Sequence, residues 1–298
     1  MGVQKNGISW TDRTWNPIVG CSRVSSGCDH CWAERMARVH YHHEFPKGWN
    51  GNVMAFPDRI LQPNHWKKPC RVAVGLMGDI FHKKMSFGLL DHIWATMGCC
   101  ELPDLRHLTF QILTKRPDRM LEYAKYRAES GMVFGLPNLW VGVSVEDQET
   151  ANIRIPILND HIKAVVKFVS LEPLLGPVIF RNVPGFNRID LNLRNWWIIV
   201  GGESGPGSRP MNPNWVRSIR DQCQVSGVPF HFKGWGDWAQ NQYVAGNAFG
   251  YAKAKRTLFD NSSHKFAFDD QTMMERVGKK AAGRMLDGHE WLEFPEVA

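Results

Sequence analysis

Short, almost wholly apolar runs alternate with helical patterns along the first 235 residues. Seven runs have the length and composition of buried strands, beginning with the extended segment 8–19 and continuing at 71–77, 108–113, 139–143, 165–169, 196–200 and 228–232. The spacing of apolar residues between them predicts helices at 32–42, 87–97, 118–129, 147–158 and 213–225. Apolar strands separated by helices are typical of a parallel sheet covered by helices. We therefore predict an α/β fold with a full or partial (β/α) barrel of about six to seven parallel strands; a doubly wound open sheet is the alternative.

This alternation stops near residue 235. Residues 241–270 contain few apolar side chains and several Gly and Asn, and residues 274–288 form a short stretch punctuated by glycine. Such composition is typical of loops and short turns. We predict two parts, a barrel domain at 1–235 and a loop-rich C-terminal extension at 236–298 that packs on the barrel.

Polar residues follow the carboxyl ends of the predicted strands. They are Asp79, Lys115, Arg116, Ser144, Glu146, Ser170, Glu172, Glu203 and Lys233. In a parallel barrel these ends meet on one face, so the side chains would share a mouth. The alternative is that loops are polar wherever they occur.

The charged residues of this set allow two interpretations each. Lys115 and Arg116 could bind a carboxylate or phosphate, or could form ion pairs with Glu146 or Glu172. Glu203 and Lys233 could pair with each other or transfer protons. We take Glu203, Lys233 and Lys115 as the candidate catalytic residues.

Three of the seven cysteines lie within eleven residues, between the first predicted strand and the first predicted helix. Cys21, Cys28 and Cys31 have the spacing C-x6-C-x2-C. Three thiolates on one loop suit an iron–sulfur cluster with an open corner, or a zinc ion completed by His30 or a distant residue. We expect the remaining cysteines to be buried thiols; they are Cys70, Cys99, Cys100 and Cys223.

The composition favours a cytoplasmic protein. No apolar run approaches the length of about 18 residues that spans a membrane, and the polar start Met1–Lys5 leads into no signal peptide. An odd number of unevenly spaced cysteines is more typical of thiols and metal ligands than of a disulfide framework. The sequence does not indicate an oligomeric state.

The net charge of +7 lies entirely within residues 1–250, since residues 251–298 hold eight basic and eight acidic side chains. Residues 32–71 carry seven basic and three acidic side chains, with aromatic residues interleaved. Cations and flat rings together suit a nucleic-acid groove. The alternative is a solvated loop pinned by buried tryptophans.

Several motifs together resemble a phage and prophage three-cysteine family of undefined activity, which looks like a divergent branch of the radical S-adenosylmethionine (SAM) superfamily. The motifs cover nearly the whole chain and occupy residues 20–34, 113–117, 170–174, 201–205 and 278–284.

This resemblance implies a [4Fe–4S] cluster on Cys21, Cys28 and Cys31, with SAM on the fourth iron and an external electron donor. Reductive cleavage of SAM would give a 5′-deoxyadenosyl radical that abstracts hydrogen from a substrate. Candidate SAM-binding residues are Met77, Gly78 and Asp79 after the second strand, Ser144 and Glu146 after the fourth, and Arg116 and Glu172.

We therefore expect a radical SAM enzyme that acts on a nucleic-acid base, DNA or RNA, in modification or repair. The alternative is a zinc-containing nucleic-acid-binding protein without turnover.

Overall fold

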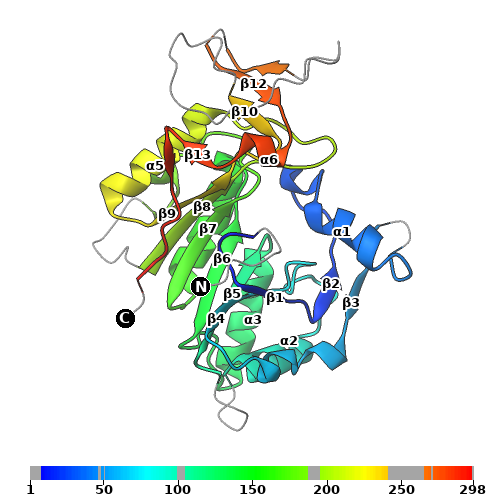
Figure 1. Cartoon of the computed structure of the whole chain (residues 1–298). Coiled ribbons are helices and arrows are strands. Elements are labelled where there is room, and N and C mark those ends of the chain that lie inside the picture. Colours follow the sequence, from blue (N-terminus) through cyan, green and yellow to red (C-terminus); the bar gives the residue numbers. More distant parts are fainter. Residues whose placement is uncertain are drawn as a thin grey trace.

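A curled sheet of seven parallel strands forms the centre of the computed structural model, which describes residues 8–45, 48–49, 51–98, 105–186, 195–240, 265–269 and 271–296 (Figure 1). In spatial order the strands are β1 (Arg13–Trp15), β4 (Cys70–Val74), β5 (Leu108–Thr114), β6 (Leu139–Ser144), β7 (Val166–Leu171), β8 (Trp196–Gly201) and β9 (Phe230–Gly234). Each pair of neighbours is parallel. The sheet is a half-barrel, so the predicted partial barrel is confirmed.

Helices cover the outer face of this half-barrel. They are α2 (Phe87–Gly98), α3 (Pro117–Glu129), α4 (Gln148–His161) and α5 (Pro213–Ser226). Alternate strand residues such as Val72, Phe110 and Val141 pack with helix residues in one large apolar core. The side-chain period of two in a strand explains why every second residue faces the helices.

The opposite, concave face carries a second apolar cluster. It contains Trp10 and Phe294 from the two ends of the described chain, together with the strand residues Trp140, Phe168 and Trp197. Toward the carboxyl ends of the strands this face is lined by smaller residues, Gly142, Ser144, Ser170 and Gly201. Bulky side chains therefore fill one end of the half-barrel, and small residues line its mouth.

The helix boundaries agree with the local sequence. The Asp147 side chain accepts a hydrogen bond from the Thr150 backbone N–H at 2.9 Å and caps α4, and Asn212 caps α5 in the same way. α5 ends at Gly227 in the left-handed conformation (φ 66°), which glycine adopts readily.

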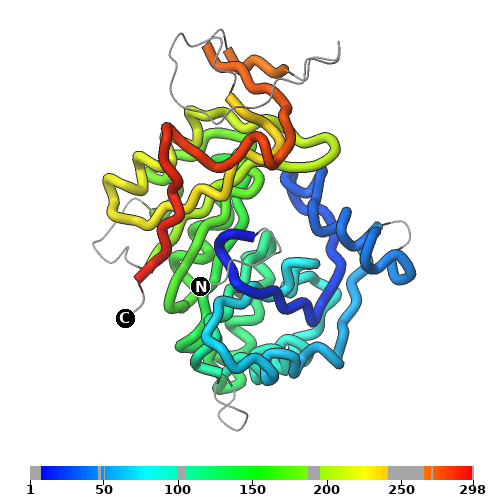
Figure 2. Tube along the Cα trace, viewed as in Figure 1, coloured from blue at the N-terminus to red at the C-terminus, as the bar shows by residue number. Residues whose placement is uncertain are grey.

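The segment between β1 and β4 leaves the sheet and returns to it (Figure 2). It contains β2 (Ile18–Gly20) and β3 (Val53–Ala55), the helix α1 (Trp32–His40), and the 3-10 turns η1 (Ser26–Cys28), η2 (Pro57–Arg59) and η3 (Gln62–His65). β2 and β3 form an antiparallel pair that the sequence did not predict.

The last described part of the chain forms small antiparallel sheets. One sheet contains β10 (Trp238–Gln240), β11 (Lys265–Ala267) and β12 (Met273–Arg276). The helix α6 (Lys279–Ala282) follows, and then a second sheet of β13 (Met285–Leu286) and β14 (His289–Glu290). The remaining 3-10 turn, η4 (Phe180–Asn182), lies earlier in the chain, after β7. Most of the stretch 241–270, predicted to be loop-rich, lies outside the described residues, and the division into two domains stays a prediction.

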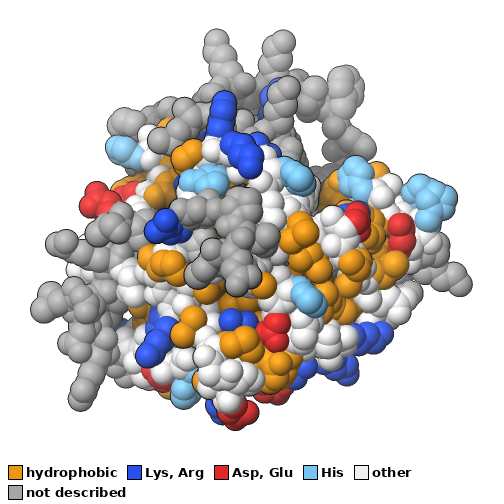
Figure 3. Space-filling model, turned by 90° about the horizontal axis from the view of Figure 1, so that it is seen from below, with side chains coloured by type: hydrophobic (Ala, Val, Ile, Leu, Met, Phe, Trp, Pro, Cys, Tyr) orange, Lys and Arg blue, Asp and Glu red, His pale blue; other side chains and the backbone are white. Residues whose placement is uncertain are grey.

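The surface shown in Figure 3 carries basic, acidic and hydrophobic side chains side by side. The positive net charge is not gathered on the described part of this face. Among the described helices, none is long and apolar enough to cross a membrane.

Candidate functional site

The three cysteines lie on the loop that joins β2 to α1, which we call the cysteine loop (residues 21–31). Cys21 follows β2, Cys28 ends η1, and Cys31 directly precedes α1. All three are half-buried free thiols. Burial and the charge of Asp79 raise the pKa of Cys21 to about 11, and burial also raises the pKa of Cys31. Both thiols are therefore protonated at neutral pH, and a metal ion would have to displace their protons.

The three thiols, as they are placed, do not form a metal site. Among the described residues, no group of three or more His, Cys, Asp or Glu side chains is arranged to hold a metal ion. The donor set nevertheless fits a thiolate-bound cluster in element and number, because three unpaired soft ligands lie on one short loop. To bind a cluster, the three side chains would have to turn toward one another.

Arg116, which follows β5, holds the beginning of the cysteine loop. Its Nη2 donates hydrogen bonds to the Ser22 carbonyl at 2.9 Å and to Ser22 Oγ at 2.8 Å, and it lies 3.9 Å from Cys21 Sγ. His82 Nε2 lies 3.0 Å from the same hydroxyl oxygen. The predicted cofactor-binding Arg116 thus contacts the loop that carries the cysteines.

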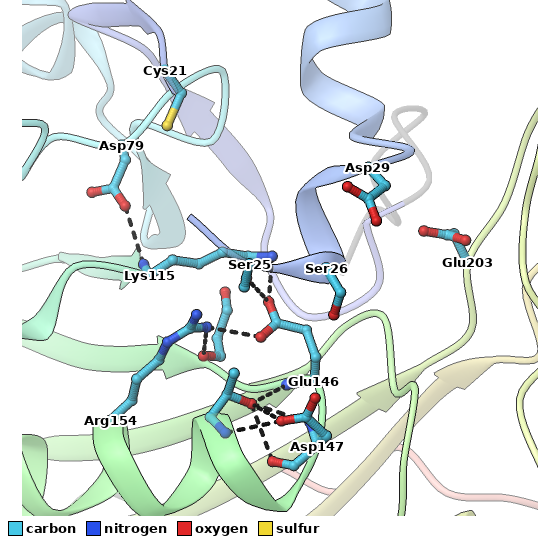
Figure 4. A network of polar contacts seen from close by, with 12 residues as sticks. Cys21, Ser25, Ser26, Asp29, Asp79, Lys115, Glu146, Asp147, Arg154 and Glu203 are labelled. Atoms are coloured by element: carbon cyan, nitrogen blue, oxygen red, sulfur yellow. Dashed lines mark hydrogen bonds and ion pairs between the residues drawn. The ribbon is translucent and has the colours of Figure 1, made fainter. Parts of the chain in front are cut away.

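Glu146, which follows β6, holds the middle of the loop and is fully buried (Figure 4). Its carboxylate accepts a hydrogen bond from the Ser25 hydroxyl at 3.0 Å. It also forms ion pairs with Lys115 Nζ at 2.5 Å and with Arg154 Nη1 at 3.0 Å. Burial alone would raise the pKa of this carboxyl, but the charges of Lys115 and Arg154 hold it below its ordinary value. Of the two interpretations of Lys115, the ion pair with Glu146 is the one observed.

Glu203 and Arg209, on the loop after β8, hold the far side of the cysteine loop. Glu203 is buried and accepts three hydrogen bonds from Arg209, at 2.7 to 3.0 Å. The same guanidinium donates to the Ser26 carbonyl at 2.8 Å and lies 3.4 Å from Asp29. The backbone here is tightly packed, since a Cβ on Gly202 would lie 2.1 Å from the Trp235 carbonyl oxygen.

Of the two interpretations of Glu203 and Lys233, the pairing with each other is not observed, because each has a different partner. The loop after β8 turns back, so that Glu203 meets Arg209, whereas Lys233, at the end of β9, forms an ion pair with Glu172 after β7. Glu172 also accepts the Ser170 hydroxyl at 3.3 Å.

Met77, Gly78 and Asp79 line the wall beside Cys21. The Met77 carbonyl accepts the Gly20 N–H at 2.9 Å, so it is already engaged, and Met77 packs in the apolar cluster that includes Cys21 and Cys31. Asp79 is buried and accepts the Thr114 hydroxyl and the Lys115 N–H. Burial raises its pKa despite these hydrogen bonds.

The structure thus brings the predicted strand-end residues to one mouth, and most of their charges pair there. Sequence reasoning missed the residues that tie the cysteine loop to this mouth, Ser22, Ser25, His82, Arg154 and Arg209. His82, Arg154 and Arg209 lie farther from the ends of the predicted strands, and Ser22 and Ser25 belong to the cysteine loop, where only the cysteines were singled out. Cys223 is buried and Cys70 half-buried; Cys99 and Cys100 lie outside the described residues.

Comparison with known proteins gives one match. No curated protein and no solved structure is similar enough to match the chain. The model of one family, described as "Protein of unknown function (DUF5131)", matches residues 5–295. Since the match spans nearly the whole sequence, the chain belongs to the DUF5131 family.

Proposed function

We propose that this protein is an enzyme that binds a [4Fe–4S] cluster through Cys21, Cys28 and Cys31 and cleaves SAM at the open iron. The observation that carries the proposal is the seating of the cysteine loop. Side chains that follow three different strands, β5, β6 and β8, bind this one loop through Arg116, Glu146 and Arg209. A loop held so firmly at a barrel mouth is suited to position a reactive group there.

When bound and reduced, the cluster would supply the electron that cleaves the sulfonium of SAM. The chain's own residues would hold and orient the reactants. Arg116, close to Cys21 Sγ, favours the thiolate form of that ligand because a cation stabilises the negative sulfur. The nearby apolar side chains of Met77 and Trp49 exclude water from the same side.

The proposed substrate is a nucleic acid. Helix α1 directly follows Cys31 and presents the exposed side chains of Trp32, Arg38 and Val39. Histidines 40, 42 and 43 are also exposed at the end of this helix. Exposed aromatic and cationic groups next to the cysteine loop suit stacking on bases and contact with phosphates.

The test is anaerobic reconstitution with iron and sulfide, followed by dithionite and SAM. The wild type should turn brown and release 5′-deoxyadenosine, and Cys28→Ala should abolish both. Cys70→Ala is the matched control, because Cys70 is a half-buried thiol on β4 outside the cysteine loop. Product formation that survives Cys28→Ala would overturn the proposal.

A structural zinc site is the other outcome of the same experiment. It would need a fourth ligand, and the nearby His30 has its ring against Gly207, on the loop after β8. Stoichiometric zinc that is retained under iron reconstitution, without SAM cleavage, would support a binding protein in place of an enzyme.

A further inference from the structure

A polar cavity of about 500 Å³ lies beside the edge strand β1. The end of α1, η2 and η3 form its other walls, and its polar lining includes Asn16, Tyr41, Asp58, Arg59, Gln62 and His65. The sequence analysis assigned no individual role to these residues, although all except Asn16 lie in the segment 32–71 that suits a nucleic-acid groove. The volume is in the range of small-molecule sites.

One wall of this cavity is a rigid, flat cation. The Arg59 guanidinium lies 3.9 Å from the centre of the Phe56 ring and 5.4 Å from the centre of the Tyr41 ring, and it donates a hydrogen bond to the Tyr41 hydroxyl at 2.9 Å. The Arg59 carbonyl accepts the indole N–H of the buried Trp15 at 2.7 Å, which fixes this residue to the core. A planar ligand could stack here without ordering a mobile side chain.

The edge of the cavity offers both donors and acceptors. The Asn16 side-chain oxygen accepts the Met77 N–H at 2.9 Å, so its amide NH₂ remains a donor. Asp58 and Gln62 are exposed, and among the described residues neither makes a side-chain hydrogen bond or ion pair. The Asp58 carboxylate only accepts hydrogen bonds, whereas the Gln62 carboxamide both donates and accepts them.

This combination excludes several ligand classes. A free phosphate would be repelled by Asp58. Among the described residues, no group could hold a metal ion. A flat ring could stack on the Arg59 guanidinium, and an edge with both donors and acceptors could bond to the polar groups at the edge of the cavity. Nucleobases have both features.

We propose that this cavity binds one base of a single-stranded nucleic acid. The base stacks on Arg59 and Tyr41, and its edge bonds to Asn16, Asp58 and Gln62. The exposed Lys67 and Lys68 follow η3 closely and suit the adjoining phosphates. Through Asn16 the cavity adjoins Met77, which packs against Cys21 and Cys31. The inference rests on the nucleic-acid part of the proposed function, and not on the cluster.

The test measures binding of a fluorescein-labelled 12-nucleotide single strand to the full chain without cluster, by anisotropy at low salt. Asp58→Asn and Gln62→Ala should each weaken binding about fivefold or more. Arg59→Lys keeps the charge but removes the planar platform, and should weaken it similarly. Glu129→Gln, an exposed change at the end of α3, is the matched control and should bind as the wild type does.

An abasic strand of equal length separates base recognition from phosphate attraction. We expect it to bind at least about fivefold more weakly than the base-bearing strand. Equal affinity for both strands, or unchanged affinity in all three cavity variants, would overturn the inference. Because no cluster is present, this result is independent of whether the reconstituted protein cleaves SAM.

Discussion

Gly27 shows how closely the cysteine loop is fitted to the barrel mouth. A Cβ at this position would lie 2.5 Å from Glu146 Cγ and 2.7 Å from Lys115 Nζ. Since Glu146 is fully buried and held by three partners, it has no room to move aside. A side chain at the residue before Cys28 would therefore force Glu146 or Lys115 to shift.

We predict that Gly27→Ala lowers the free energy of unfolding by about 1–3 kcal/mol, as overpacking does. Gly88→Ala is the control, because a Cβ at Gly88 in helix α2 meets no atom within 4 Å. That variant should lose no stability, because the added Cβ meets open space and Ala favours a helix over Gly. Urea unfolding measures both, and equal stability of the two variants would contradict the proposed fit.

The negative charge of Glu146 balances the positive charges of Lys115 and Arg154 at the barrel mouth. Glu146→Gln leaves Lys115 and Arg154 with less negative charge beside them, and we predict a loss of about 3 kcal/mol, typical of a broken buried pair. Glu122→Gln, which removes the exposed partner of Arg119, should cost less than about 1 kcal/mol. If thermal unfolding shows that Glu146→Gln and Glu122→Gln lose the same amount of stability, the buried charge network does not stabilise the fold.

Among the elements, the loop after β8 has a positioning role toward the cysteine loop. Arg209 joins Glu203 to the Ser26 carbonyl, two residues before Cys28. We predict that Arg209→Ala speeds alkylation of Cys28 at least about tenfold, because η1 loses one of its anchors.

Mass spectrometry of partly alkylated protein measures this rate for each cysteine. Arg209→Lys should restore part of the protection, and the rate at Cys70 should stay unchanged because this thiol lies on β4, outside the loop. A uniform increase at all cysteines would indicate general unfolding and contradict a positioning role.

Strand β9 places a histidine inside the concave face. His231 is fully buried beside Trp197 and Phe294, and its Nε2 lies 2.8 Å from Ser9 Oγ. Burial lowers its pKa to about 4. Since the unfolded state then binds the proton more tightly, this group's contribution to stability is present above about pH 6.5 and is lost as the pH falls toward 4.

We predict that titration of His231 lowers the free energy of unfolding of the wild type by about 2 kcal/mol between pH 7 and pH 5. His231→Gln keeps a hydrogen-bonding side chain but cannot titrate, so its loss over the same interval should be smaller by that amount. Denaturant unfolding at the two pH values gives the comparison. Parallel losses in both proteins would show that His231 is not the titrating group.

At the level of elements, the sequence was informative wherever apolar runs were long. Strands β4 to β9 and helices α2 to α5 lie within a few residues of their predicted positions, because burial on the sheet requires those runs. The pairs β2–β3 and β10–β12 were missed, since strands of three or four residues show no period. The partners of Glu203 and Lys233 depend on the path of a loop, which local pattern does not encode.

For the whole molecule, the central feature is a half-barrel, with the segment between β1 and β4 on the side opposite strands β7 to β9 (Figure 1). As predicted, the cysteines lie directly before the first helix, but the predicted strand 8–19 is divided into β1 and β2, and the cysteines follow β2, which lies outside the parallel sheet. The sequence could not predict how strands β5, β6 and β8 each contribute a side chain to hold that loop. These contacts join residues up to 183 positions apart in the sequence.

The most direct test of this account is the iron and acid-labile sulfide content of anaerobically reconstituted protein. The account predicts about four irons and four sulfides per chain in the wild type and in Cys70→Ala, as expected for a [4Fe–4S] cluster. Cys28→Ala should lose most of both. Iron below about one per chain in the wild type, or equal iron in Cys28→Ala, would contradict a cluster on the cysteine loop.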